Sequence, residues 1–222
     1  MHPILYVTSG AAIICIISLA AMLIDAFRKY RTDLSEPRGS KTGGIIYAFT
    51  AGMLPGSKES ISHHIITYLA GIILHIGVFS AFLYSAAYPL VTNLLFGKIA
   101  NYYETGITIF YVNYFTPAML VLIPTGLACG LGLLVKRIAS PRMRYISSLD
   151  DYFSNILVNL FLASAVYSVL QPGSYIMYYI ETAVLLYIPL GKLKHCAFFS
   201  ATRIMFGIFY GHRGILPKAN NS

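Results

Sequence analysis

Charged residues are scarce in this sequence, at 11% of 222 residues, whereas 57% are hydrophobic. The segments between the apolar runs are too short to bury a core of their own, which excludes a soluble domain. Several apolar runs exceed the roughly 20 residues that cross about 30 Å of hydrocarbon. The chain is therefore predicted to be an all-α integral membrane protein in contact with lipid, with residues 1–222 as a single domain.

Cysteine is also rare, and its spacing argues against several kinds of site. Cys15, Cys129 and Cys196 lie in apolar surroundings and form no CxxC or CxxCH pattern. Disulfides, zinc ribbons and covalently attached c-type haem are therefore not expected. The three cysteines are instead expected to be buried packing residues. The first apolar run, 4–26, lacks a basic segment before it and a small-residue cleavage site after it. It is predicted to be a retained span.

Five transmembrane helices are predicted from the apolar runs. The turn Gln171–Ser174 is short enough to make the fourth and fifth antiparallel neighbours. Asp150 or Asp151 is expected to cap the fourth helix, and Pro117 and Pro124 to kink the third. The approximate helix ranges are 4–27, 64–90, 108–135, 152–171 and 174–198, followed by a cytoplasmic tail over 199–222.

Basic residues gather on one side of these predicted spans. By the positive-inside rule, the N-terminus lies outside and the first long loop, the third loop and the tail are cytoplasmic. The net charge of +8 follows from this bias, so no nucleic-acid role is inferred. The residues concerned are Arg28, Lys29, Arg31, Arg38, Lys41 and Lys58, then Lys136, Arg137, Arg142 and Arg144, then Arg203, Arg213 and Lys218, against Lys98 on the opposite side.

Two histidines in apolar sequence are the strongest functional signal. On the five-helix topology, His75 and His195 lie at compatible depths in the second and fifth helices. Histidines on facing helices commonly hold a non-covalent haem. Small residues nearby would leave room for the macrocycle, namely Gly71, Gly77, Gly191 and Ala197. The alternative is that each imidazole only forms a hydrogen bond to a carbonyl or to a Ser or Thr side chain.

Further histidines and one acid are secondary candidates. His64 lies about 16 Å below His75 on the same helix face, where it would contact a propionate or a quinone, or ligate a second haem with His212. An ordinary interfacial role stays open for both. His63 points elsewhere and is expected to be solvated. Glu181, inside the fifth helix, is either functional or a protonated carboxyl bonded to a neighbouring Tyr or Asn.

Three segments resemble the membrane cytochrome b (gamma) subunit of respiratory nitrate reductase. They are LHIGVFSAF in the second helix, SPRMRYISSLDDY before the fourth, and PLGKLKH at the end of the fifth. Two further segments, FTAGMLPGSKES and FYGHRGILP, resemble more closely the relatives in transmembrane redox complexes of sulfate reducers. The iron–sulfur partners of those relatives are related to heterodisulfide reductase.

The resemblance implies five helices, an outside N-terminus, the inner membrane of a prokaryote, haem b and quinone chemistry. It assigns His75 and His195 as axial ligands of the haem nearer the cytoplasm. The ligands of the family's outer haem fall at Ser85 and Met177. Because serine is not a plausible iron ligand, the resemblance implies that the outer haem is lost and that one bis-histidine haem b remains.

The predicted function is that of a haem b membrane anchor, not catalytic alone. It would transfer electrons between menaquinone or another quinone and a cytoplasmic iron–sulfur subunit. That partner would dock on 28–62, on 136–150 and on the tail after Phe198. The quinone is expected near His64, Lys192 or Lys194, whose N–H groups would donate to a reduced quinone oxygen, although ordinary interface roles fit them equally.

Two alternatives stay open at this point. One is a cofactor-free structural anchor in which His75 and His195 only form hydrogen bonds. The other is a small transporter whose pathway acid is Glu181. A reduced haem spectrum would separate the haem protein from both.

Overall fold

The computed structural model describes residues 2–30, 34–54, 64–96 and 110–216. All regular structure in these ranges is helical. Four of the helices found there are long and apolar enough to cross a membrane, and there are five spans if the bent pair Ile176–Tyr187 and Lys192–Arg213 counts as one. The prediction of an all-helical fold is confirmed for these ranges, and the helices are compatible with a multi-pass membrane protein.

The chain forms two compact units. The single domain over 1–222 stays a prediction. Unit 1 comprises residues 1–13 and 66–192, and unit 2 comprises residues 14–65 and 193–222. The first helix, α1 (Pro3–Lys29), contributes its opening residues to unit 1 and the remainder to unit 2.

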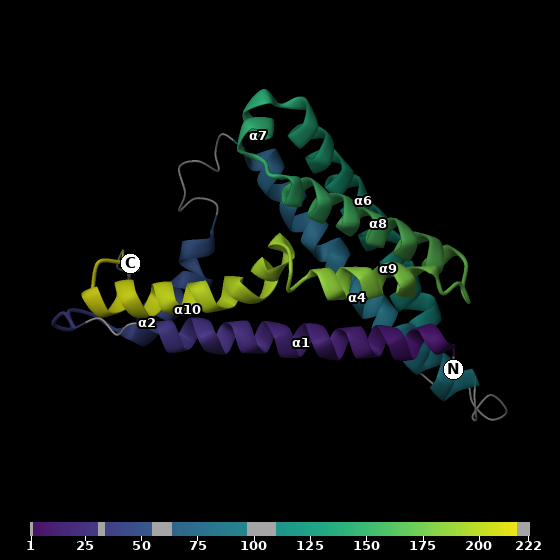
Figure 1. Cartoon of the computed structure of the whole chain (residues 1–222), viewed down its shortest axis with the longest axis horizontal. Coiled ribbons are helices and arrows are strands. Elements are labelled where there is room, and N and C mark those ends of the chain that lie inside the picture. The colour runs from purple at the N-terminus through teal and green to yellow at the C-terminus, as the bar shows by residue number, and fades with distance from the viewer. Residues whose placement is uncertain (1, 31–33, 55–63, 97–109, 217–222) are drawn as a thin grey trace. The chain divides into compact units, whose positions relative to one another are not determined.

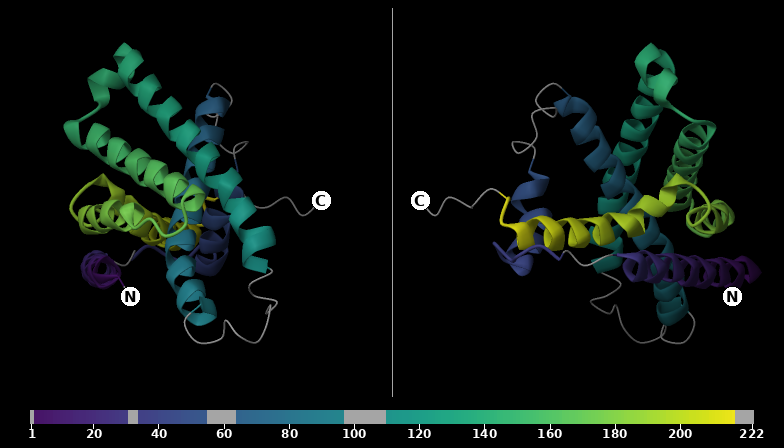
Figure 2. Two further views of the ribbon diagram at one scale, coloured as in Figure 1. Left: turned by 90° about the vertical axis from the view of Figure 1, so that its right-hand side faces the viewer. Right: turned by 60° about the vertical axis from the view of Figure 1, so that its left-hand side comes forward.

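Unit 1 is a bundle of long apolar helices. These are α4 (Ile65–Phe96), α6 (Thr116–Ala139), α8 (Leu149–Leu170) and α9 (Ile176–Tyr187). The short helix α7 (Pro141–Ile146) joins α6 to α8, which lie side by side in both figures, and α8 also packs on α9 (Figures 1 and 2). The side chains of Phe161, Ile123, Leu162 and Met177 are fully buried in this bundle.

The start of α6 shows how the third span accommodates Pro117. The turn η3 (Tyr111–Phe115) before it is a π-helix, in which the Thr116 N–H reaches back to the Tyr111 carbonyl. A π-turn lets the proline ring avoid the carbonyl one turn earlier. The expected disturbance at Pro117 is therefore a local widening of the helix, while Pro124 lies inside α6.

The cap of α8 differs from the expectation. Ser148 is the N-cap residue, and Asp151 completes a capping box by accepting the Ser148 N–H at 2.8 Å. Asp150 does not cap the helix. Its carboxylate instead accepts the Lys192 N–H at 3.0 Å.

The predicted fifth helix, 174–198, is not continuous. The helix α9 ends at Tyr187, and the 3-10 turn η4 (Lys192–Lys194) precedes a separate helix, α10 (His195–Arg213). Pro189 and Gly191 lie in the break, and both disfavour helix. Residues 199–213 of the predicted cytoplasmic tail are helical, because they belong to α10.

Unit 2 is built around the crossing of α10 with α2 (Lys41–Phe49), which is followed by the 3-10 turn η1 (Ala51–Met53). Glycines let the two backbones meet. A Cβ on Gly44 would lie 2.0 Å from the Gly207 carbonyl oxygen, and one on Gly211 would lie 2.8 Å from the Gly44 Cα. The long connector after α1 therefore contains a helix that packs on the end of the chain.

Candidate functional site

The His75 imidazole is held by a hydrogen bond within α4, an arrangement that fits both a ligand to iron and a histidine that bonds only to a carbonyl. His75 is exposed on α4, and its Nδ1 lies 2.6 Å from the Gly71 carbonyl oxygen. Because a carbonyl only accepts, Nδ1 must carry the proton and donate it. In the neutral ring Nε2 then holds the lone pair, which is the tautomer that an axial ligand needs.

The small residues around the two histidines have different roles. No described atom lies within 4 Å of a Cβ placed on Gly71, so the face beside His75 is open there. In contrast, Gly77 packs against Gly126, and the Tyr187 ring fills the space beside Gly191. Of these three glycines, only Gly71 leaves the room that was expected for a macrocycle.

His195 is the first residue of α10, and its side chain is exposed. It belongs to unit 2, whereas His75 belongs to unit 1. The prediction that His75 and His195 lie at compatible depths assumed an unbroken helix through residue 198. The break after Tyr187 shows that this assumption does not hold. A continuous helix would separate Glu181 from His195 by about 21 Å along its axis. Because the helix is broken, that distance does not apply.

A polar network within unit 1 fixes Lys192, the first residue of η4. The Lys192 ammonium lies 2.6 Å from an Asp151 carboxylate oxygen, and Arg137 lies 3.5 Å from the other oxygen of that carboxylate. Asp150 accepts the backbone N–H of Lys192, and it also binds the Tyr187 hydroxyl. The ends of α6, α8 and α9 are thereby tied together three residues before His195.

This network changes how two of the candidate quinone contacts are interpreted. The Lys192 cation is already engaged with Asp151. Lys194 in η4 and His64, just before α4, are both exposed. Of the three residues considered for a quinone or a propionate, Lys194 and His64 therefore keep that role as candidates.

His212 has a structural role. It is 8% exposed, and its Nε2 donates to the Ser35 carbonyl at 2.8 Å. The His212 carbonyl in turn accepts the N–H groups of Arg38 and Gly39, at 2.9 and 3.1 Å. His212 thus holds the segment before α2 against the end of α10, which favours the hydrogen-bonding interpretation over haem ligation.

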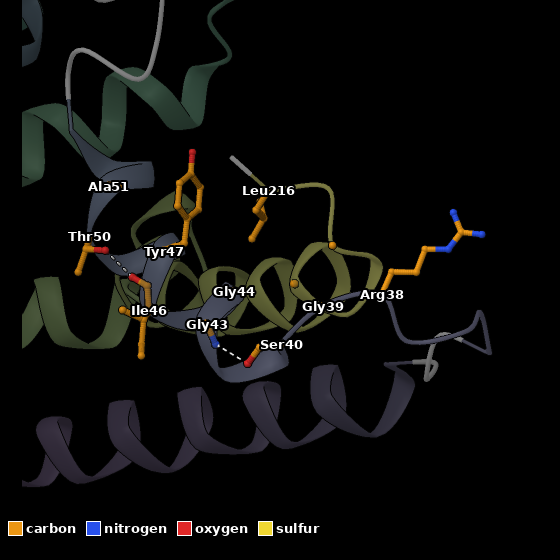
Figure 3. Close-up of a pocket in the computed structure, with 12 residues that line it drawn as sticks. Arg38, Gly39, Ser40, Gly43, Gly44, Ile46, Tyr47, Thr50, Ala51 and Leu216 are labelled. Carbon is orange, nitrogen blue, oxygen red and sulfur yellow. Dashed lines mark hydrogen bonds between the residues drawn. The ribbon is translucent and has the colours of Figure 1, made fainter. Parts of the chain in front are cut away.

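A pocket of about 390 Å³ lies beside this contact in unit 2 (Figure 3). Its wall is mainly small residues and backbone, and the Arg38 side chain extends away from the other lining residues in Figure 3. The Ser40 hydroxyl accepts the Gly43 N–H, and the Ser40 carbonyl accepts the Gly44 N–H. Ser40 is therefore already engaged within the start of α2.

Ser85 and Met177, which the resemblance places at an outer haem, are packed inside unit 1. Met177 is fully buried, and Ser85 lies 2.8 Å from Glu181 through Oγ and Oε1. A Tyr or Asn partner was expected for this acid. The partner is Ser85, 96 positions away in the sequence. This pairing depends on the packing of α4 on α9, so the sequence alone did not indicate it.

Several other residues considered from the sequence are not part of a described site. His63, Lys58, Lys98, Arg31 and Lys218 lie outside the described residues. Cys15, Cys129 and Cys196 are free thiols. Within the described ranges, no group of three or more His, Cys, Asp or Glu side chains forms a metal site, although a haem held by two histidines requires none.

Comparisons of this chain with protein-family models, with curated proteins and with solved structures find no match. The function is therefore inferred from the residues alone.

Proposed function

We propose that this protein is a membrane-embedded electron-transfer subunit that holds one haem b between His75 and His195. It would pass electrons between a membrane quinone and a cytoplasmic iron–sulfur partner. The haem would supply the one-electron redox chemistry, and the protein would supply its axial imidazoles, burial and orientation.

The observation that carries this proposal is the hydrogen bond from His75 Nδ1 to the Gly71 carbonyl, at 2.6 Å. It sets the tautomer in which Nδ1 carries the proton and Nε2 holds the lone pair, and a Cβ placed on Gly71 would meet no neighbouring atom within 4 Å. Metal-ligating histidines in proteins almost always have their second nitrogen bound in this way. His195 is proposed as the second ligand from the resemblance of PLGKLKH.

A single haem is supported by the packing at the outer position. Met177 is fully buried and Ser85 is bonded to Glu181, so neither offers a ligand to iron. His212, which the sequence made a candidate for a second haem, donates to Ser35 instead.

The topology belongs to the same proposal. The basic ends of α1 and α6, carrying Arg28, Lys29, Lys136 and Arg137, favour the cytoplasmic side, with the N-terminus outside in the inner membrane of a prokaryote. The bent pair of α9 and α10 would then serve as the fifth span. The quinone would bind on the cytoplasmic side near His64 or Lys194.

A surface for the iron–sulfur partner is supported by side chains on and after α7. Arg142 and Arg144 are exposed there, and so are Tyr145 at 93% and Leu149 at 90%. Cations beside exposed apolar side chains are typical of a protein interface. These four residues belong to the SPRMRYISSLDDY motif, and none of them takes part in the capping box or in the contacts of Arg137.

The direct test is a haem count on the protein purified in mild detergent. We expect a reduced low-spin b-type spectrum and one haem per chain in the pyridine haemochrome assay. A protein that carries no haem would refute the proposal, and two haems per chain would refute the single-haem form of it.

A further inference from the structure

A buried polar pair, Glu181 and Ser85, lies in unit 1 where α9 packs on α4. Glu181 is 6% exposed and Ser85 is 4% exposed. Ser85 Oγ lies 2.8 Å from Glu181 Oε1 and 2.9 Å from the Phe82 carbonyl oxygen. The other carboxyl oxygen, Oε2, is buried and has no hydrogen-bond partner among the described residues.

The number of protons in this cluster decides its chemistry. A serine hydroxyl has one proton, and a backbone carbonyl can only accept. If Ser85 donates to the Phe82 carbonyl, the hydrogen atom between Ser85 and Glu181 must come from the carboxyl group. The two short contacts of one hydroxyl are therefore both satisfied when Glu181 carries a proton on Oε1.

The surroundings agree with an uncharged carboxyl. No ion pair in the described part of the chain includes Glu181. The titratable groups nearby are phenols: Tyr178 of α9, whose hydroxyl donates to the Ser85 carbonyl at 3.0 Å, and beyond it Tyr84, Tyr88 and Tyr111. An unpaired carboxylate in such surroundings is strongly unfavourable, whereas an unpaired carbonyl oxygen of a neutral acid costs far less.

We propose that Ser85 and Glu181 form a proton-binding site inside the membrane-spanning part of the protein. Its ligand is a single proton, held by the Glu181 carboxyl and directed at Ser85 Oγ. The site does not depend on haem and lies at residues that the electron-transfer proposal leaves unused.

The test uses a hydrophobic carbodiimide on the intact protein in mild detergent. The carboxyl O–H adds across a C=N bond of the reagent, and the resulting O-acylisourea rearranges to a stable N-acylurea with no leaving group. We expect peptide mapping by mass spectrometry to find the adduct at Glu181 at neutral pH, with labelling that declines at alkaline pH. Glu181→Gln should remove this adduct, because an amide is not a substrate.

Two controls separate the alternatives. Sodium or potassium ions should not reduce the labelling, and protection by either would overturn the proposal in favour of a metal-cation site. Infrared difference spectra between Glu181→Gln and the parent protein should show the loss of one protonated-carboxyl C=O band. Absence of that band would overturn the proposal whether or not the reagent reaches the site. Ser85→Ala should keep the band but shift it, since the acceptor of the carboxyl proton is removed.

Discussion

The backbones of Gly77 and Gly126 lie directly against each other where α4 crosses α6. A Cβ added to Gly77 would lie 2.7 Å from the Gly126 Cα, and the reverse substitution meets the same distance. Small residues at a helix crossing permit the close backbone approach on which membrane helix association depends. This contact is within unit 1 and adjoins the helix turn that carries His75.

Gly77→Val should therefore force α4 and α6 apart and destabilise the protein by about 1–3 kcal/mol or more. The measurement is the thermal unfolding midpoint in detergent. Gly132→Ala is the matched control, because no described atom lies within 4 Å of the added methyl group. A midpoint equal to that of the parent in Gly77→Val would contradict the close contact.

His75→Ala and His195→Ala should each abolish haem binding, because a methyl group cannot replace an axial bond. Haem content per chain, measured by the pyridine haemochrome assay, checks this. His212→Ala should retain the parent's haem content. A normal low-spin spectrum in either ligand variant would remove that residue from the proposed site.

His212→Ala should instead loosen the segment before α2. The substitution removes the donor to the Ser35 carbonyl and should cost about 1–3 kcal/mol, as expected for a buried hydrogen bond. Limited proteolysis should then cleave within 35–39 faster than in the parent. His64→Ala, at an exposed residue outside this contact, is the control and should leave the cleavage rate unchanged.

Asp151→Asn should weaken the junction of α6, α8 and the first residue of η4, Lys192. The variant loses the carboxylate that faces both Lys192 and Arg137 and weakens the cap at Ser148. We expect a loss of about 1–2 kcal/mol in the free energy of unfolding. Asp25→Asn, which breaks only the exposed pair with Lys29, should change stability by less than half as much.

Replacing Arg142 and Arg144 together with alanine should weaken association with the iron–sulfur partner while haem content stays normal. The readout is the amount of partner that co-purifies from native membranes under mild detergent. The difference from the parent should shrink as ionic strength rises, because salt screens the charges that the variant lacks. Arg137→Lys is a suitable control, since it keeps the charge near Asp151. Equal recovery of the partner with the double variant and the parent would contradict docking at α7.

The first four spans could be predicted from the sequence because a long apolar run is itself the physical requirement for crossing a membrane. The predicted range 64–90 compares with α4 at Ile65–Phe96, and 152–171 compares with α8 at Leu149–Leu170. The capping box was also readable, since Ser148 and Asp151 have the required spacing. The prediction named the aspartates and overlooked the serine.

The fifth span could not be predicted correctly from hydropathy. The run stays apolar from Ala183 to Leu190, so only the backbone preferences of Pro189 and Gly191 signal the break. The partners of Glu181 and Lys192 depend on which helices pack together. Ser85 and Glu181 are 96 positions apart, and Asp151 and Lys192 are 41 positions apart. No local sequence pattern predicts contacts between residues so far apart.

The crossing of α2 with α10 has a consequence for synthesis. The glycine face of α2 is translated more than 150 residues before its partner surface at Gly207 and Gly211. Until then α2 has no helix to pack on, and long-range contacts of this kind form slowly. A chain that stops before residue 207 lacks this partner and should therefore leave the glycine face of α2 exposed.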